Sequence, residues 1–216
     1  NPNNPTGQLI QPELLKKILQ CCKEKKILAV VDECFIDFVE NPKKTGIKDL
    51  IFGNNELFVL RAFTKNYAMP GIRLGYGICG NTKLLEKLSR AGQPWSVSRI
   101  AQEAGIAALK EDVYLEKSRQ LVFRERQLLQ EGLSRLGYRV FPPGANYIFF
   151  KLEKRKDPLY HKNLGKDLRK EGILIRDCSN YAGLEEGYFR IAVRTGAENE
   201  RLLAALERRE QLWQSV

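Results

Sequence analysis

The sequence predicts an α/β fold with a mostly parallel sheet, followed by a smaller α+β domain. Short runs of aliphatic and β-branched residues, such as "ILAVVDE" and "ELFVLRAF", are typical of strands buried on both faces of a parallel sheet. Segments with apolar residues at helical spacing separate these runs. Strands that alternate with helices indicate an α/β architecture.

The first half of the chain contains the elements expected of the sheet. The opening "NPNNPTG" is a turn, because proline fixes φ and moves the preceding residue away from helix. Residues 11–26 place apolar side chains at helical spacing behind Pro12, which predicts a helix. Strands are expected at residues 27–33, 57–61 and 73–79. Ligands of such sheets bind at the carboxyl ends of strands, and Asp32 and Lys65 follow two of these ends.

The second half predicts a different arrangement. Residues 97–137 favour helix, apart from breaks near Asp112, and residues 138–152 form two strands around a Pro-Pro-Gly turn. A helix over 159–171, strands at 172–177 and 187–194 and a helix from Glu198 complete the pattern. The domain boundary is expected inside the long helix, with residues 1–120 in the first domain and residues 121–216 in the second.

Composition narrows the class of protein. The chain has 216 residues, of which 43% are hydrophobic and 29% are charged, as in soluble globular proteins. No signal peptide is visible, and no run approaches the ~20 apolar residues that cross a bilayer. The five cysteines show no C-x-x-C spacing, and most stand beside aliphatic residues. They are expected to be buried, reduced thiols of a cytosolic protein that has no metal site.

The net charge of +10 raises the question of an acidic partner. Lysines and arginines alternate with acids, as in "KEKK" and "EKRKDP", and no basic stripe is interleaved with aromatics as single-strand binders require. The net positive charge, distributed in this way, therefore favours a small anionic ligand, such as a phosphate ester, over nucleic acid.

Three side chains are candidates for chemistry. Lys65 is flanked by aromatic, small and apolar residues in "AFTKNYAMPG", which suits a partly desolvated ammonium that forms Schiff bases; the alternative is a solvated surface lysine. Arg73 is a rigid fork suited to a phosphate ester. Asp32 is either a cap or loop carboxylate, or a buried acid that pairs with a protonated pyridine nitrogen.

The ordered motifs "NPNNPTG", "VVDECFIDF" and "LRAFTKNYAMPGIRLGYG" resemble fold-type I pyridoxal-phosphate (PLP) enzymes of the histidinol-phosphate aminotransferase-like branch. With "QPWSVS", "GANYIFF" and the stretch from 172 to 206, they are most similar to the threonine-phosphate decarboxylase family of cobalamin biosynthesis. The resemblance runs from the first residue to about residue 206. In this family the opening turn lies mid-chain, so the sequence is expected to lack the N-terminal part of the family's unit, including part of its active site.

The resemblance implies the aspartate-aminotransferase-like fold, PLP as cofactor, and a role for each matching residue. Lys65 would form the Schiff base with the cofactor, Asp32 would pair with the pyridine nitrogen, and Asn4 would bind the ring oxygen O3′. Thr64 and Arg73 would bind the cofactor phosphate. Among substrate contacts, Arg190 would hold the α-carboxylate and Arg176 the substrate phosphate; strand-edge charges are the alternative for both arginines.

Departures from the family pattern also carry information. Phe35 replaces a tyrosine that related aminotransferases use at O3′, and decarboxylase-like sequences share this Phe. Ala62 replaces a hydroxyl residue at the phosphate. The single histidine, His161, lies in a polar helix and is expected to be solvated.

The resemblance favours a cytoplasmic, homodimeric decarboxylase of L-threonine O-3-phosphate. Three alternatives stay open. The first is an aminotransferase acting on histidinol phosphate or an aromatic amino acid. The second is the PLP-sensing domain of a transcription regulator. The third is a PLP-site fold used only for binding or assembly.

Overall fold

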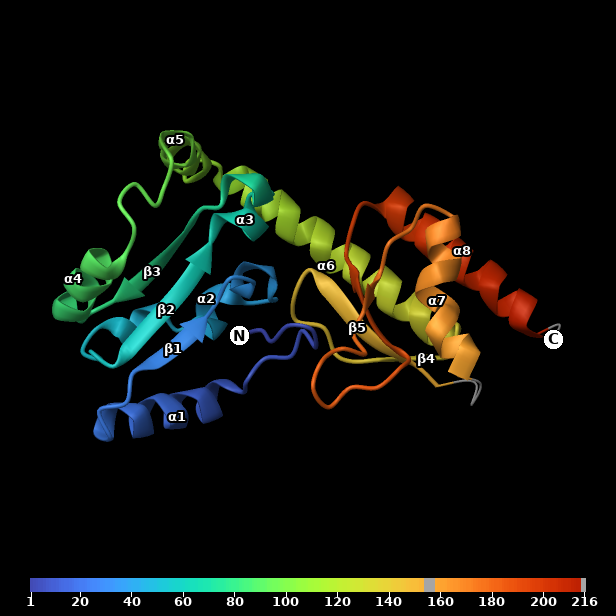
Figure 1. Ribbon diagram of the computed structural model, residues 1–216, viewed down its shortest axis with the longest axis horizontal. Coiled ribbons are helices and arrows are strands. Elements are labelled where there is room, and N and C mark those ends of the chain that lie inside the picture. The colour runs from blue at the N-terminus through green and yellow to red at the C-terminus, as the bar shows by residue number, and fades with distance from the viewer. Residues whose placement is uncertain (154–157, 215–216) are drawn as a thin grey trace. The chain divides into compact units, whose positions relative to one another are not determined.

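The computed structural model describes residues 1–153 and 158–214 (Figure 1). The backbone forms two compact units, of which the first comprises Asn1–Pro2 and Leu9–Arg119, and the second Asn3–Gln8 and Gln120–Val216. The division falls inside helix α6 (Asp112–Arg135). The opening turn groups with the second unit, whereas the sequence analysis placed it in the first domain.

The first unit holds short elements around a small sheet. In chain order they are α1 (Pro12–Glu24), β1 (Ala29–Asp32), η1 (Ile36–Phe38), α2 (Pro42–Thr45), η2 (Lys48–Ile51), β2 (Leu57–Ala62), α3 (Phe63–Asn66), η3 (Pro70–Ile72), β3 (Gly75–Cys79), α4 (Thr82–Ala91) and α5 (Arg99–Ala108). Helix α1 begins at Pro12, where proline costs nothing because the N–H groups of a first turn have no helical partner. The sequence-predicted helix and three strands of this half are therefore present.

The sheet of the first unit has the order β1-β2-β3. Strands β1 and β2 are parallel, with Asp32 opposite Leu60, whereas β3 runs antiparallel to β2. The link between β2 and β3, residues 63–74, contains only short helical turns and lacks the crossover helix that usually joins parallel strands. One of the two pairings is thus parallel.

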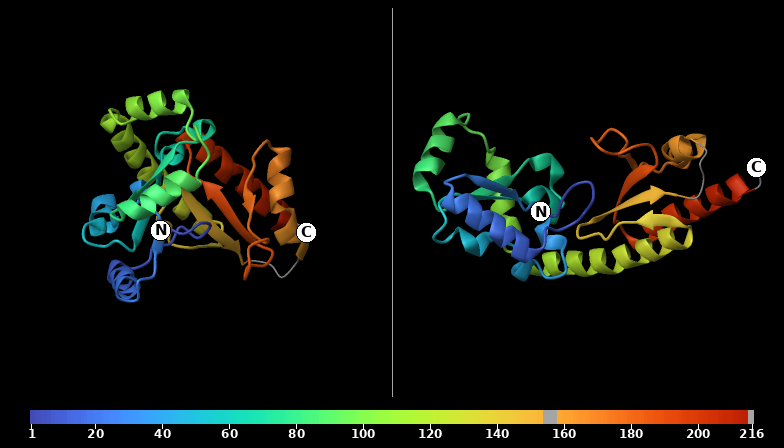
Figure 2. Two further views of the ribbon diagram at one scale, coloured as in Figure 1. Left: turned by 60° about the vertical axis from the view of Figure 1, so that its left-hand side comes forward. Right: turned by 90° about the horizontal axis from the view of Figure 1, so that it is seen from below.

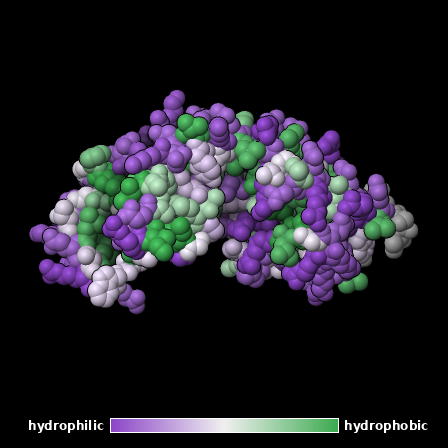
Figure 3. Space-filling model, turned by 90° about the horizontal axis from the view of Figure 1, so that it is seen from above, coloured by the Kyte–Doolittle hydropathy of each residue, from purple (hydrophilic) through white to green (hydrophobic). Residues whose placement is uncertain are grey.

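Helix α1 covers one face of this sheet (Figure 1). Its side chains Leu15 and Leu19 pack with Leu57, Val59 and the segment around Ile51 into a buried cluster. The opposite face is open, since Val30 is 57% exposed. The expectation that the first strand is buried on both faces is therefore wrong, because among the described residues a helix covers only one face. Figure 3 shows hydrophobic residues reaching the surface in the part of the view where the first unit lies.

The second unit contains longer elements. They are the part of α6 from Gln120 onward, β4 (Tyr138–Val140), β5 (Tyr147–Leu152), α7 (Pro158–Lys170), β6 (Arg176–Asp177), β7 (Tyr188–Ala192) and α8 (Gly196–Gln214). The strands form an antiparallel sheet in the order β4-β5-β7-β6. The two strands around the Pro-Pro-Gly turn and both later helices are confirmed. The strand expected at 172–177 is shorter, because only its last two residues pair with β7.

Helices α6 and α8 run side by side in the second unit (Figure 2). Gly132 lets the helices approach closely, since a Cβ there would lie 2.6 Å from the Leu203 methyl groups, which would have to move. The core contains large side chains that are almost fully buried, among them Phe149, Phe150 and Phe189. Such a core holds its strands, and the residues on them, in fixed register.

Candidate active site

A cavity of about 530 Å³ opens in the first unit where β2 ends and β3 begins. It is lined by Cys34, Leu60, Arg61, Ala62, Thr64, Lys65, Arg73, Leu74, Gly75, Tyr76 and Gly77. Three of the predicted site residues, Thr64, Lys65 and Arg73, therefore share one cavity. A hydroxyl and two cations in one hollow are suited to an anionic ligand.

The short helix α3 presents Thr64 and Lys65 to this cavity. Phe63 anchors the helix, since its ring is buried and its N–H donates to the Leu74 carbonyl at 3.1 Å. The Lys65 side chain is exposed, and its Nζ lies 5.4 Å from the centre of the Phe35 ring. The expectation of a partly desolvated ammonium is therefore wrong for the described residues: the aromatic neighbour lies beside the amine without enclosing it.

Asp32 is the last residue of β1. It does not line the cavity itself, but it is hydrogen-bonded to Cys34, which does. Its Oδ1 accepts a hydrogen bond from the Cys34 N–H at 2.9 Å. Burial, together with the hydrogen bond to Asp32 and the charge of that carboxylate, raises the pKa of the Cys34 thiol to about 12, while Lys65 acts in the opposite direction. The Asp32 carboxylate itself is exposed. Of the two alternatives for Asp32, the described residues show the loop carboxylate and not the buried acid, because Asp32 shares the uncovered face of the sheet with Val30.

Arg73 reaches the same cavity from the turn before β3. Its backbone is in the left-handed region, with φ of 58° and ψ of 43°, and its Nη1 donates to the Pro70 carbonyl at 3.0 Å. This local bond orients the guanidinium, although the side chain is exposed. Ala62, predicted to weaken the phosphate site by one donor, also lines the cavity.

The second unit gathers another group of predicted residues. Arg190 on β7 and Arg176 on β6 stand directly opposite each other in the sheet, so both side chains leave the same face. The Arg190 Nη1 donates to the Asn4 Oδ1, and its guanidinium lies 5.2 Å from the centre of the Tyr147 ring. Arg190 lies in the middle of β7, whereas Arg176 is the first residue of β6.

Neighbouring side chains orient both arginines. The Arg176 Nη2 donates to the Asn180 Oδ1 at 3.1 Å, and its guanidinium lies 5.7 Å from the centre of the Tyr181 ring. The Tyr147 hydroxyl donates to the Asn3 carbonyl at 2.8 Å, which ties the opening turn to β5. Asn4, assigned from the sequence to the cofactor, thus belongs with the second unit's arginines.

Sequence reasoning missed a charged group at the wall of the first cavity, which Arg61 lines. Arg61, within the apolar strand β2, forms an ion pair of 2.7 Å with Glu33 and a longer one of 3.5 Å with Asp37. A signal for this group was present, since a charge inside an apolar strand requires a partner. The acids of "DECFID" are the nearest candidates in the sequence.

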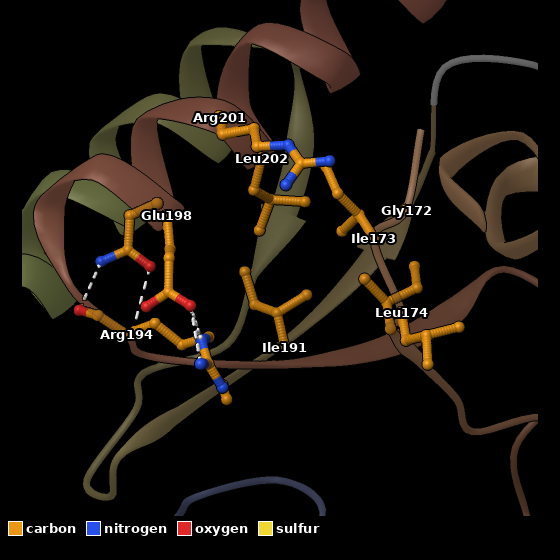
Figure 4. A pocket seen from close by; sticks show the side chains of 11 residues that line it. Gly172, Ile173, Leu174, Ile191, Arg194, Glu198, Arg201 and Leu202 are labelled. Carbon is orange, nitrogen blue, oxygen red and sulfur yellow. Dashed lines mark hydrogen bonds and ion pairs between the residues drawn. The ribbon is translucent and has the colours of Figure 1, made fainter. Parts of the chain in front are cut away.

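The second unit contains a further cavity, of about 360 Å³, shown in Figure 4. Apolar side chains such as Ile173, Ile191 and Leu202 form its wall, and Arg194 at its rim is paired with Glu198 at 2.6 Å. No residue assigned to the site from the sequence lines this cavity.

Two expectations about single residue types need correction. His161 is half-buried, not solvated, because α7 brings its ring against Gly187, where a Cβ would lie 3.2 Å from Nδ1. All five cysteines are free, but Cys21 is exposed and only Cys178 is buried, since "CC" on α1 points partly to solvent.

Within residues 1–153 and 158–214, no cluster of three or more His, Cys, Asp or Glu side chains is arranged to hold a metal ion. In the same stretches, no helix has both the length and the apolar character that crossing a bilayer requires.

Comparison with known proteins identifies the family of the chain. The model of the family "Aminotransferase class I and II" matches residues 1–206. Threonine-phosphate decarboxylase of Salmonella typhimurium is 38% identical over 206 residues, which are 95% of this chain and 55% of that protein. The chain therefore spans about half the length of this curated relative.

Solved structures extend the comparison. A histidinol-phosphate aminotransferase from Clostridium acetobutylicum superposes with a TM-score of 0.90 at 37% identity, covering 97% of this chain and 62% of that one. A histidinol-phosphate aminotransferase from Sinorhizobium meliloti, solved in complex with pyridoxal-5′-phosphate, gives a TM-score of 0.83 at 25% identity, covering 99% of this chain and 56% of that one.

These matches confirm the resemblance, the fold and the cofactor class inferred from the sequence motifs. Decarboxylases and aminotransferases occur together among the relatives, at similar identity. The chain belongs to the class I and II aminotransferases, a family of PLP-dependent enzymes.

Proposed function

We propose that the full-length protein decarboxylates L-threonine O-3-phosphate to aminopropanol phosphate, as a PLP-dependent carbon-carbon lyase of cobalamin biosynthesis. The observation that carries this proposal is the shared cavity of Thr64, Lys65 and Arg73 beside Asp32, in a chain 38% identical to a threonine-phosphate decarboxylase. Its first unit would be the C-terminal part of the PLP-binding domain, and its second unit the small domain.

The donor set of the first cavity fits PLP. Lys65 Nζ is an exposed amine available for covalent attachment of the cofactor aldehyde. The Thr64 hydroxyl and the Arg73 guanidinium supply donors for the phosphate, and the Asp32 carboxylate supplies the partner of a protonated pyridine nitrogen. When bound, PLP supplies an electron sink for the bond that breaks at the substrate's Cα.

Lys65, Cys34 and Asn4 would then have different roles in the reaction. Lys65 Nζ would hold the cofactor before the substrate amine replaces it, and would afterwards return a proton to Cα. Cys34 would hold the Asp32 carboxylate in orientation, because its backbone N–H donates to it. The role of Asn4 at the ring oxygen stays a prediction.

Arg190 and Arg176 would bind the two anionic groups of the substrate. They stand opposite each other on neighbouring strands, where Cα atoms are about 5 Å apart, and both leave the same face. Threonine phosphate carries a carboxylate and a phosphate a few bonds apart, which suits two arginines at opposite positions of neighbouring strands. Arg190 would hold the α-carboxylate and Arg176 the phosphate.

A histidinol-phosphate aminotransferase is the second candidate, favoured by the TM-score of 0.90 to such an enzyme. Its substrate class offers a phosphate but no α-carboxylate on the phosphorylated partner. Phe35, which decarboxylase-like sequences share, favours the lyase. We further propose that the protein is a cytoplasmic homodimer, and that it acts as an enzyme and not as a regulator.

Product analysis separates these candidates. The full-length protein, loaded with PLP, is incubated with threonine phosphate, with and without 2-oxoglutarate. The proposal predicts carbon dioxide and aminopropanol phosphate in equal amounts, independent of 2-oxoglutarate. Formation of glutamate and a keto acid, only when 2-oxoglutarate is present, would establish the aminotransferase instead.

A further inference from the structure

A group of charged and polar side chains joins the two segments that carry Asp32 and Lys65. We call it the Arg61 network, and it consists of Glu33, Asp37, Arg61, Asn66 and Arg119. Nothing in the proposed chemistry uses these residues directly. All of them belong to the first unit.

The contacts of Arg61 form the centre of this network. Its Nη2 lies 2.7 Å from a Glu33 carboxylate oxygen, and its Nη1 lies 3.5 Å from the Asp37 Oδ1. The other Glu33 oxygen accepts from the Ile47 N–H at 2.9 Å. The Glu33 side chain is 0% exposed and that of Arg61 11% exposed, so this pair is withdrawn from water.

Asp37 extends the network to the residue after Lys65. Its Oδ2 accepts a hydrogen bond from the Asn66 Nδ2, and its backbone carbonyl accepts from the Arg119 Nε at 3.0 Å. Asp37 thereby links Asn66 on α3 with Arg119 on α6. Asn66 itself is buried, whereas Lys65 beside it is exposed.

The residues of the network stand next to the proposed cofactor-binding residues in the sequence. Thr64 and Lys65 lie between Arg61 and Asn66 in the sequence. Glu33 directly follows Asp32. The network therefore connects the end of β1 to the turn that carries Lys65, close to the atoms proposed to hold the cofactor. The backbone also makes room for it, since a Cβ on Gly46 would lie 3.2 Å from the Arg61 Nη2.

Stability alone is a poor explanation for such a pair. Replacing a buried ion pair with apolar side chains of similar volume is often neutral or stabilising, whereas removing one partner costs about 3–5 kcal/mol. Buried pairs with fixed geometry can instead specify one arrangement of the segments they join. Here those segments are the end of β1 and the turn that carries Lys65.

We propose that the Arg61 network positions the Lys65 amine relative to the Asp32 carboxylate, with Arg61, Asp37 and Asn66 as positioning residues. The inference rests on the proposed attachment of PLP to Lys65. Loss of one member would let the α3 turn shift while the sheet stays folded. The cofactor would then be bound less tightly, and its lysine attachment would titrate at a different pH.

The test compares Arg61→Gln and Asn66→Ala with wild type in the full-length protein. Arg99→Gln is the matched control, because it breaks an exposed ion pair with Glu103 in the same unit. The readouts are the dissociation constant of PLP, the pH at which the visible absorbance of the bound cofactor changes, and circular dichroism. Borohydride labelling and peptide mapping of the wild-type protein check the attachment at Lys65 separately.

Both network variants are expected to bind PLP about 10- to 100-fold more weakly, by analogy with other groups that orient a directly bonded ligand. Their absorbance change is expected to move by about half a pH unit or more, and Arg99→Gln to match wild type. Asn66→Ala removes a single hydrogen bond, so it keeps the test decisive if Arg61→Gln does not fold. A folded Asn66→Ala variant with wild-type PLP affinity and absorbance profile would overturn the inference. A wild-type label on another lysine would overturn the proposed site instead.

Discussion

The two units of the chain hold their candidate site residues in different ways. Among the residues that the structure describes, ten of the twelve largest fully buried side chains belong to the second unit, and only Ile36 and Leu57 belong to the first. In the first unit, large apolar side chains are exposed instead, including Trp95 at 95% and Phe52 at 87%. Large, fully buried side chains thus surround the strands of Arg176 and Arg190, whereas the buried cluster of the first unit contains few side chains of this kind.

This difference shows what each group of residues depends on. The paired arginines of the second unit are fixed by strand register, which a packed aromatic core maintains. Lys65 and Asp32 lie on a short helix and at a strand end, and the charged Arg61 network joins their segments. Mutations should therefore act through packing in the second unit and through charge in the first.

The largest effect on stability is expected from a substitution in the core of the second unit. Phe150→Ala in the 216-residue chain should lower the free energy of unfolding by about 3–5 kcal/mol, because a fully buried ring leaves a cavity. Phe52→Ala is the control in the first unit, and its exposed ring should change stability by less than about 0.5 kcal/mol. Urea unfolding measures both. Equal losses would mean that the two units do not differ in packing as described.

Arg190→Ala should have the next largest effect, on activity. A charge-assisted hydrogen bond contributes about 1.5–3 kcal/mol, so kcat/KM should fall by about one to two orders of magnitude. The loss should be similar for threonine phosphate and for any slow reaction with threonine, because both carry the α-carboxylate. A loss confined to the phosphorylated substrate would exchange the roles of the two arginines.

Arg176→Ala should affect the reaction with only one of the two substrates. Use of threonine phosphate should fall by about one to two orders of magnitude, whereas reaction with threonine should scarcely change, since threonine has no phosphate for Arg176 to bind. Steady-state kinetics with the two substrates measures this ratio. If both reactions suffer equally, Arg176 supports the sheet and does not select the phosphate.

Local sequence was enough to group part of the candidate site. Thr64, Lys65 and Arg73 are separated by only nine positions, and the turn that contains them lies between two strands that the apolar pattern indicates. Asp32 could likewise be assigned to a strand end. These predictions succeeded because strand ends and short turns follow from residues close in sequence.

The remaining features depend on contacts between distant segments. Whether Asp32 and Val30 are buried is decided by which face of the sheet is covered, and no local pattern states this. The opposition of Arg176 and Arg190 follows from strand register, and the hydrogen bond of Asn4 to Arg190 joins residues 186 positions apart. Periodicity identifies elements, but it does not identify their partners.

The most direct test of the account is the location of the cofactor bond. Full-length protein is loaded with PLP, reduced with borohydride, digested and mapped by mass spectrometry, with Lys65→Ala as the control. The account predicts a single labelled peptide that contains Lys65, and no label in the variant, which should also lose activity by about 10²- to 10⁴-fold. A label on another lysine, or a Lys65→Ala variant with wild-type turnover, would contradict it.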